Sequence, residues 1–76
     1  MKVHIEVTDT FGGEANYAWV RRYILTLPMI ASDLAVVRQT KKLIGWTHKR
    51  CVRETHGDML VLRPQGECVV CFITFD

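Results

Sequence analysis

Three cysteines and a histidine stand at spacings that could bind a metal ion. His48 precedes Cys51 by three positions, Cys68 precedes Cys71 by three, and 16 residues separate the two pairs. This spacing falls within the range of ribbon-type zinc sites. A zinc knuckle brings both ligands of a pair to one ion, but residues three apart in a strand point to opposite faces of a sheet. Because we expect Cys68 and Cys71 to lie in one strand, we predict no bound metal and no cofactor, and these four residues remain the alternative zinc-ligand set.

Cys51 is also the candidate for a nucleophilic thiol. It lies among His48, Lys49, Arg50 and Arg53, and such a cationic setting favours the thiolate. A catalytic thiol also needs a base that a third group orients, and a site for an oxyanion, and the sequence offers no obvious residues for either. The G-x-S-x-G, P-loop and H-E-x-x-H motifs are absent, as is a pair of carboxylates spaced to share one face. We therefore predict that Cys51 packs in a strand and that the protein is not an enzyme.

Basic residues are concentrated in the middle of the chain. Six of the ten lysines and arginines lie between Arg38 and Arg53, and no acidic residue falls inside that window. Such a surface can meet an acidic patch on a protein, or hold a phosphate backbone while an aromatic side chain stacks on a base. It can also simply complement the dipole at the end of a helix. We predict that the partner-binding residues are Arg38, Lys41, Lys42, Trp46, His48, Lys49 and Arg50.

Aromatic residues alternate with other residues in a second candidate binding segment. If the segment is a strand, Tyr17, Trp19, Arg21 and Tyr23 share one face, and RNA-recognition modules stack bases on such a face. Two leucines continue the same face, however, which is more typical of a core. We therefore expect this row to pack in the core or at its rim.

The composition limits what kind of chain carries these residues. Its 76 residues are 49% hydrophobic and 24% charged, with a formal net charge of +2, which predicts a single domain over residues 1–76 with a small core. No apolar run approaches the roughly 18 residues of a membrane span, and the N-terminus has no signal-peptide pattern. An odd number of cysteines, three, is typical of a reducing compartment. We therefore expect a cytoplasmic protein that does not enter a membrane.

The first half of the chain predicts two strands. Lys2 to Thr8 alternates apolar and polar residues, the period of a half-buried strand, and Gly12 and Gly13 mark a turn after it. The segment from Tyr17 to Leu27 fits both a strand and an amphipathic helix. Its aromatic and β-branched residues favour the strand.

A helix and three further strands complete the predicted fold. Ser32 is a good N-cap, and Gly45 a good C-terminal cap, for a helix from Ser32 or Asp33 to Ile44. Its apolar side would carry Val36, Val37, Thr40, Leu43 and Ile44, opposite Arg38, Lys41 and Lys42. Runs at Lys49 to Thr55, Met59 to Arg63 and Cys68 to Phe75 predict strands joined by turns at His56-Gly57-Asp58 and Pro64-Gln65-Gly66-Glu67.

The predicted fold class is therefore α+β, with one helix packed on a mainly antiparallel sheet in the order ββαβββ. We predict that the core draws on residues from the first strand, the helix and the last two strands: Val3, Ile5, Val7, Val37, Ile44, Val61, Val70 and Phe72. Which face of each of the last strands is covered stays open.

Three short stretches carry a resemblance. They are DTFGGEANY (residues 9–17), SDLAVV (residues 32–37) and LRPQGEC (residues 62–68), and with them the chain resembles the short orphan proteins of bacteriophages and prophages. Many such proteins, anti-CRISPR proteins among them, act by occupying a surface of a host protein. The resemblance implies a non-enzymatic protein-binding module, such as an inhibitor of a host or defence complex. A small nucleic-acid-binding protein is the alternative.

Overall fold

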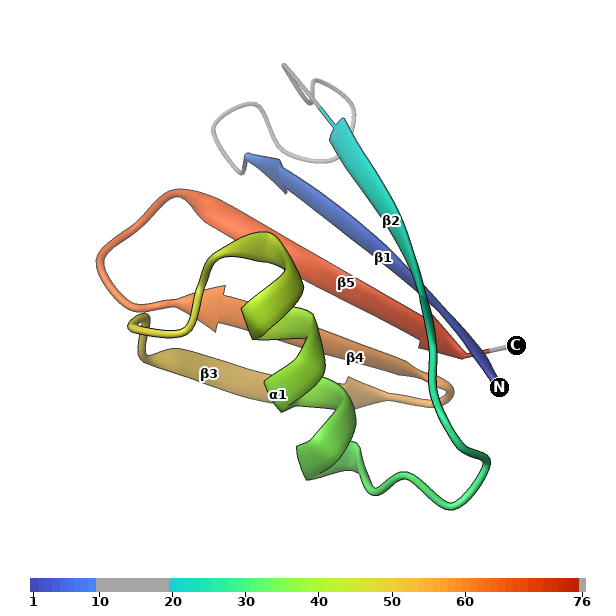
Figure 1. The fold of residues 1–76 in the computed structure, drawn as a ribbon. Coiled ribbons are helices and arrows are strands. Elements are labelled where there is room, and N and C mark those ends of the chain that lie inside the picture. Colours follow the sequence, from blue (N-terminus) through green and yellow to red (C-terminus); the bar gives the residue numbers. More distant parts are fainter. Residues whose placement is uncertain (10–19, 76) are drawn as a thin grey trace.

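One helix lies across one face of a five-stranded antiparallel sheet (Figure 1). The computed structural model describes residues 1–9 and 20–75. Along the chain the elements are β1 (Lys2–Asp9), β2 (Val20–Thr26), α1 (Asp33–Ile44), β3 (Cys51–His56), β4 (Met59–Pro64) and β5 (Val69–Phe75). The α+β class and the order ββαβββ are confirmed.

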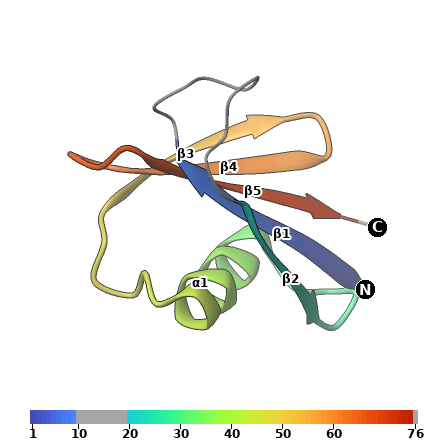
Figure 2. The same cartoon turned by 90° about the horizontal axis from the view of Figure 1, so that it is seen from above.

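The sheet brings the two ends of the chain together. Its strand order is β2-β1-β5-β4-β3, so the first and last strands lie side by side in the middle, and β2 and β3 form the edges. Every pair of neighbours is antiparallel. Figure 2 shows α1 on a single side of this sheet. We call the side that carries α1 the helix-covered face and the opposite side the outer face.

The segment that fitted both a strand and a helix forms strand β2. Its residues pair with β1, Ile5 lying opposite Tyr23 and Val3 opposite Leu25. The side chains of Tyr23 and Leu25 are half-buried and pack against the core. The predicted aromatic row is therefore core packing at Tyr23, while Tyr17 and Trp19 lie outside the described residues.

The helix begins and ends where the sequence predicts. The Ser32 side chain accepts a hydrogen bond from the Ala35 N–H at 3.2 Å, and Gly45 ends the helix with a left-handed φ of 80°. Val36 and Thr40 are buried against the sheet. Leu43, which we expected on the buried side, is exposed, because a helix touches a twisted sheet along a strip narrower than its apolar side.

The core lies between α1 and the helix-covered face. Direct partners in antiparallel strands share a face, so Ile5 with Ile73, and Val7 with Cys71, place these four residues under the helix. The buried core cluster is Val3, Ile5, Val7, Val36, Trp46, Leu60, Leu62, Cys71 and Ile73.

Three predicted core residues point the other way. Val70 and Phe72 pair with Thr8 and Glu6, and Val61 pairs with Phe72, so all three lie on the outer face. Val61 and Val70 are nevertheless buried there, and Phe72 is half-buried. The prediction that Val61 and Val70 are buried is confirmed. Their face, which the sequence left open, is set by strand pairing, because both strands are apolar nearly throughout and no alternation indicates the covered side.

Two other predicted core residues are only partly buried. Val37 and Ile44 are half-buried and pack against the cluster, while Val36 takes the central position on the helix.

Candidate functional site

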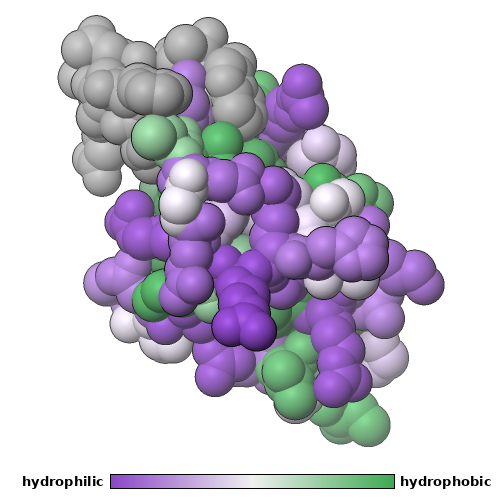
Figure 3. Space-filling view, turned by 90° about the vertical axis from the view of Figure 1, so that its left-hand side faces the viewer, coloured by the Kyte–Doolittle hydropathy of each residue, from purple (hydrophilic) through white to green (hydrophobic). Residues whose placement is uncertain are grey.

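The basic surface is formed by the second half of α1 and the connection that follows it. Arg38 and Lys42 lie exposed on the helix, and His48 and Arg50 lie exposed in the connection to β3. We use the name basic surface for these four residues. Figure 3 views the molecule from the side on which the connection from α1 to β3 lies in Figure 1, and it shows hydrophilic side chains over most of that face.

Lys41 was predicted to face solvent with its neighbours, but it is half-buried. Its ammonium group donates a hydrogen bond to the backbone carbonyl of Lys49 at 2.7 Å. Lys41 therefore fastens the chain that leaves the helix, and its charge lies beneath the basic surface rather than on it.

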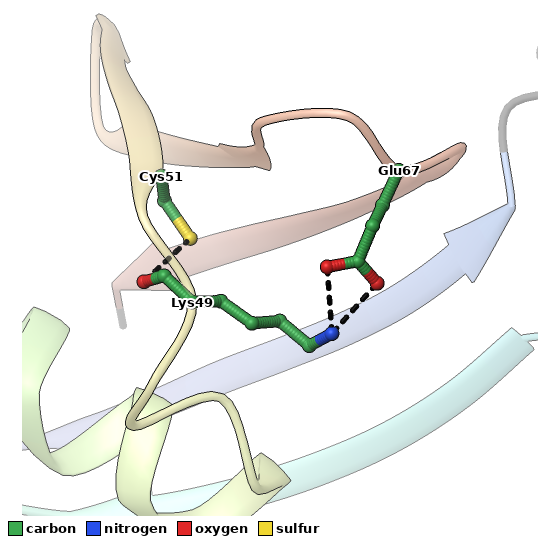
Figure 4. A network of polar contacts seen from close by, with 3 residues as sticks. All are labelled: Lys49, Cys51 and Glu67. Atoms are coloured by element: carbon green, nitrogen blue, oxygen red, sulfur yellow. Dashed lines mark hydrogen bonds and ion pairs between the residues drawn. The ribbon is translucent and has the colours of Figure 1, made fainter.

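Lys49 also makes its contacts within the molecule. Its Nζ lies 2.6 Å and 2.7 Å from the two carboxylate oxygens of Glu67, so the connection after the helix is fastened to the turn between β4 and β5 (Figure 4). This ion pair neutralises the Lys49 charge locally. Like Lys41, it shapes the basic surface without contributing a free cation to it.

Trp46, a predicted binding residue, does not lie on the basic surface. Its side chain is only 7% exposed and belongs to the core cluster. The left-handed Gly45 turns the chain back, and the Trp46 N–H donates to the Lys41 carbonyl at 2.7 Å, so the indole packs with the core near the end of the helix.

Burial raises the pKa of two of the three thiols, those of Cys51 and Cys71. Burial raises the pKa of Cys51, and Glu67 raises it further, against the opposing effect of Lys41 and Lys49. The thiol donates to the Lys49 carbonyl at 3.8 Å, rather than to the imidazole of His48 (Figure 4). This is the reverse of the arrangement that activates a cysteine nucleophile.

Cys71 is still further from activation. It is fully buried under the helix, and burial, with a smaller contribution from Cys51, raises the pKa of its thiol to about 12. Cys68, by contrast, is exposed before the start of β5.

The alternative zinc-ligand set is not assembled. Cys71 lies in the core, Cys51 is half-buried, and Cys68 and His48 are exposed. In the part of the chain that the structure describes, no three His, Cys, Asp or Glu side chains are grouped so that they could hold a metal ion.

An exposed apolar cluster at the start of α1 was missed by our sequence reasoning. Met29, Ile30 and Leu34 are all exposed, and Ile30 is 93% exposed. Figure 3 shows hydrophobic side chains gathered at the lower edge of the molecule, the end at which the β2–α1 connection lies in Figure 1. The signal was Leu34, an apolar residue on the side of the helix that carries Arg38.

Apolar and basic residues share the exposed side of α1. Leu34, Arg38 and Lys42 follow one another at four-residue intervals along the exposed side of α1. We use the name strip for these three residues, of which Leu34 is apolar and Arg38 and Lys42 are basic.

Comparisons with protein-family models, curated proteins and solved structures gave no match. None of the helices formed by the described residues is both long and apolar enough to cross a membrane.

Proposed function

We propose that this protein is a small, non-enzymatic protein-binding domain whose basic surface meets an acidic surface on its partner. The observation that carries the proposal is that three cationic side chains are exposed and unpaired. Within residues 1–9 and 20–75, Arg38, Lys42 and Arg50 are exposed and make no ion pair, so their charge is available to a partner.

Two other cations, Arg63 and Lys49, are already neutralised within the molecule. Arg63 Nε lies 2.6 Å from a carboxylate oxygen of Glu54, and Lys49 is held by Glu67. The contrast supports a surface whose charge serves an external contact rather than internal stability. Unpaired charges at a binding surface steer a partner of opposite charge and select against partners of like charge.

Two observations favour a protein partner over a nucleic acid. Trp46 is buried, so it cannot stack on a base beside the basic surface. Leu34 lies one helical turn before Arg38 and offers exposed apolar area, and protein interfaces combine an apolar centre with a polar rim. Nucleic-acid binding is the outcome against which the proposal is tested.

The state of the thiols supports a non-enzymatic role. Burial raises the pKa of Cys51 and of Cys71, which leaves both thiols mostly protonated near neutral pH and therefore poor nucleophiles. A domain of this kind acts by covering a surface. We propose that a phage or another mobile element encodes this protein, and that it inhibits a host or defence complex.

The proposal is tested by capture of partners from a lysate of the cells in which the protein acts, with and without nuclease. We expect one saturable, nuclease-resistant protein partner whose binding is lost with Lys42→Glu. The matched control is Lys2→Glu, which makes the same change of charge at an exposed position at the start of β1. Material that is captured only without nuclease, or a partner that both variants bind equally, would contradict the proposal.

A direct titration with the captured partner separates the two classes further. Nucleic-acid binding falls steeply with salt, by roughly one unit of log–log slope for each phosphate contacted. We expect the affinity for a protein partner to fall less steeply with salt, because the apolar contact of Leu34 does not depend on salt. We also expect Leu34→Ala to weaken the binding.

A further inference from the structure

Strand β2 forms one edge of the sheet. In the described residues β2 pairs with β1 alone, and its other side is not paired with any strand. Exposed sheet edges present unpaired N–H and C=O groups that can bind a further strand.

The hydrogen bonds at the start of β1 show which residues of β2 have their backbone groups at this edge. The terminal ammonium group of Met1 donates to the Leu27 carbonyl at 2.6 Å, and the Leu27 N–H donates to the Met1 carbonyl at 3.0 Å. Hydrogen-bonded pairs alternate along an antiparallel ladder, so Leu25 and Tyr23 also face β1. The N–H and C=O groups of Arg22, Ile24 and Thr26 therefore point outward.

The second half of this edge lacks the features that normally prevent pairing. Charged side chains and prolines usually protect an edge strand. In β2 the arginines occupy positions 21 and 22, and from Tyr23 to Thr26 the strand carries no charge and no proline. At its centre stands Ile24, which is 64% exposed on the outer face beside His4.

We propose that a second copy of this chain pairs with β2 in antiparallel orientation, about a two-fold axis at Ile24. Ile24 then lies opposite Ile24 of the second copy, Tyr23 opposite its Leu25, and Arg22 opposite its Thr26. All of these pairs join residues on the same face. The outward backbone groups of Arg22, Ile24 and Thr26 meet their counterparts and form about six hydrogen bonds, two for each pair.

The charges of β2 are compatible with this register. Arg22 faces a threonine and not another arginine, and its guanidinium lies 3.9 Å from Glu6 of its own chain. An axis at Tyr23 would instead place each Arg22 opposite Ile24. The register centred on Ile24 instead places Ile24 opposite Ile24 and Tyr23 opposite Leu25, so apolar side chains meet apolar side chains and Arg22 faces none of them.

The other edge of the sheet does not offer the same fit. The Gln65 N–H donates to the Arg50 carbonyl at 2.9 Å, so by the same alternation Arg53 points its backbone groups outward from β3. A two-fold axis near the middle of β3 places Arg53 or Glu54 opposite its own copy, and like charges directly opposite each other are destabilising. An axis at Val52 pairs only three residues of that strand.

Pairing through β2 has a consequence for the surface of α1. The two-fold axis runs perpendicular to the sheet, so the two sheets join into one and both helices lie on the same face. Each dimer then presents two copies of the basic surface in the same direction, which increases the avidity for a partner with repeated acidic sites. The pairing itself does not depend on the function proposed above.

Sedimentation equilibrium of the full chain, up to millimolar concentration, tests the proposal. We expect a reversible monomer–dimer equilibrium, which Ile24→Lys weakens by at least about 10-fold because two ammonium groups would meet at the axis. The matched control is Val52→Lys on the other edge strand, where Val52 is 50% exposed and the dimer should persist. Circular dichroism spectra of both variants are the check that they fold.

Disulfide trapping tests the register in a Cys68→Ser background, which removes the exposed native thiol. Ile24→Cys should cross-link to itself, since directly opposite Cα atoms in a hydrogen-bonded pair lie about 5.5 Å apart. Arg22→Cys, on the same face and equally accessible in a monomer, should not. A wild-type chain that stays monomeric, a dimer that Ile24→Lys leaves unchanged, or equal cross-linking of the two cysteine variants would overturn the proposal.

Discussion

The two faces of the sheet use the same strands in different ways. On the helix-covered face, Ile5 and Ile73 are opposite each other and fully buried beneath α1. On the outer face, Ile24 is mostly exposed, and polar pairs such as Glu6 with Arg22 lie across neighbouring strands. Successive residues of a strand therefore belong to different environments.

Residues on the helix-covered face therefore contribute most to the stability of the fold, whereas exposed residues on the outer face are available for binding. Side chains under α1 lose their contact with water completely, so their removal leaves a cavity. Side chains at the margins of the outer face keep much of their contact with water, and their cross-strand contacts are worth less. Substitutions should therefore be costly on the helix-covered face and tolerated at exposed positions of the outer face, where binding sites can change without loss of the fold.

The largest expected difference is in thiol reactivity. Cys71 lies under the helix, where burial raises the pKa of its thiol from 9.0 to about 12, so its thiolate is scarcer by a factor of about 1000 near neutral pH. We expect a thiol reagent to label the exposed Cys68 first and Cys71 only on unfolding, as mass spectrometry of timed samples would show. Equal rates would mean that α1 does not cover this face in solution.

The next largest difference is in stability. Ile73→Ala should lower the free energy of unfolding by about 3 kcal/mol, because a fully buried side chain is truncated to leave a cavity. The matched substitution Ile24→Ala on the outer face should cost about 0.5 kcal/mol or less. Urea denaturation of both variants, at low protein concentration to exclude pairing through β2, measures the two values. Comparable losses would contradict the assignment of the faces.

At Thr40 we expect a substitution to raise the free energy of unfolding, and by less than Ile73→Ala lowers it. Its side chain is fully buried between α1 and the sheet, and its hydroxyl oxygen has no hydrogen-bond partner. Thr40→Val keeps the shape and removes the unsatisfied polar group, so it should raise the free energy of unfolding by about 1 kcal/mol. Thermal and urea unfolding test this, with Thr40→Ser as the control that keeps the hydroxyl group and loses stability.

The smallest effect is expected for an ion pair on the outer face. The hydrogen bond from Arg63 holds the pKa of Glu54 below its ordinary value of 4.5. A lowered folded-state pKa contributes stability above pH 4.5 that is lost as the pH falls through the folded value. Glu54→Gln should therefore unfold slightly more easily than the wild type at pH 7, and the difference should disappear at acidic pH. Because the pair is exposed, this variant should change stability least of those considered.

Local signals in the sequence determined the elements and their order. The alternation of β1, the N-cap at Ser32, the glycine at the end of the helix, and the turns at Gly57 and Gly66 all depend on neighbouring residues alone. These glycines have left-handed φ values of 80°, 60° and 76°, as a cap or a tight turn requires. The α+β class followed from these signals because one amphipathic helix can cover one sheet.

The candidate site depended on contacts that the sequence does not display. Lys41 and Lys49 stand in the same basic window as Arg38 and Lys42, but only the folded chain brings Lys41 to a backbone carbonyl and Lys49 to Glu67, 18 residues away. Trp46 entered the core for a similar reason, since the turn at Gly45 directs it there. Charge and residue type predict that a side chain can bind a partner, but whether it is free to do so depends on distant neighbours.

The faces of β4 and β5 were also decided only by the tertiary structure. Both strands are apolar on both sides, so their own patterns do not distinguish the side that α1 covers. The choice is made by pairing, because Ile5 and Val7 place Ile73 and Cys71 beside them under the helix. The sequence by itself determined which segments become strands and helix, since those depend on residues close together in the chain. The register between strands determined which side chains became core and which remained available for contact, because it depends on residues brought together by the fold.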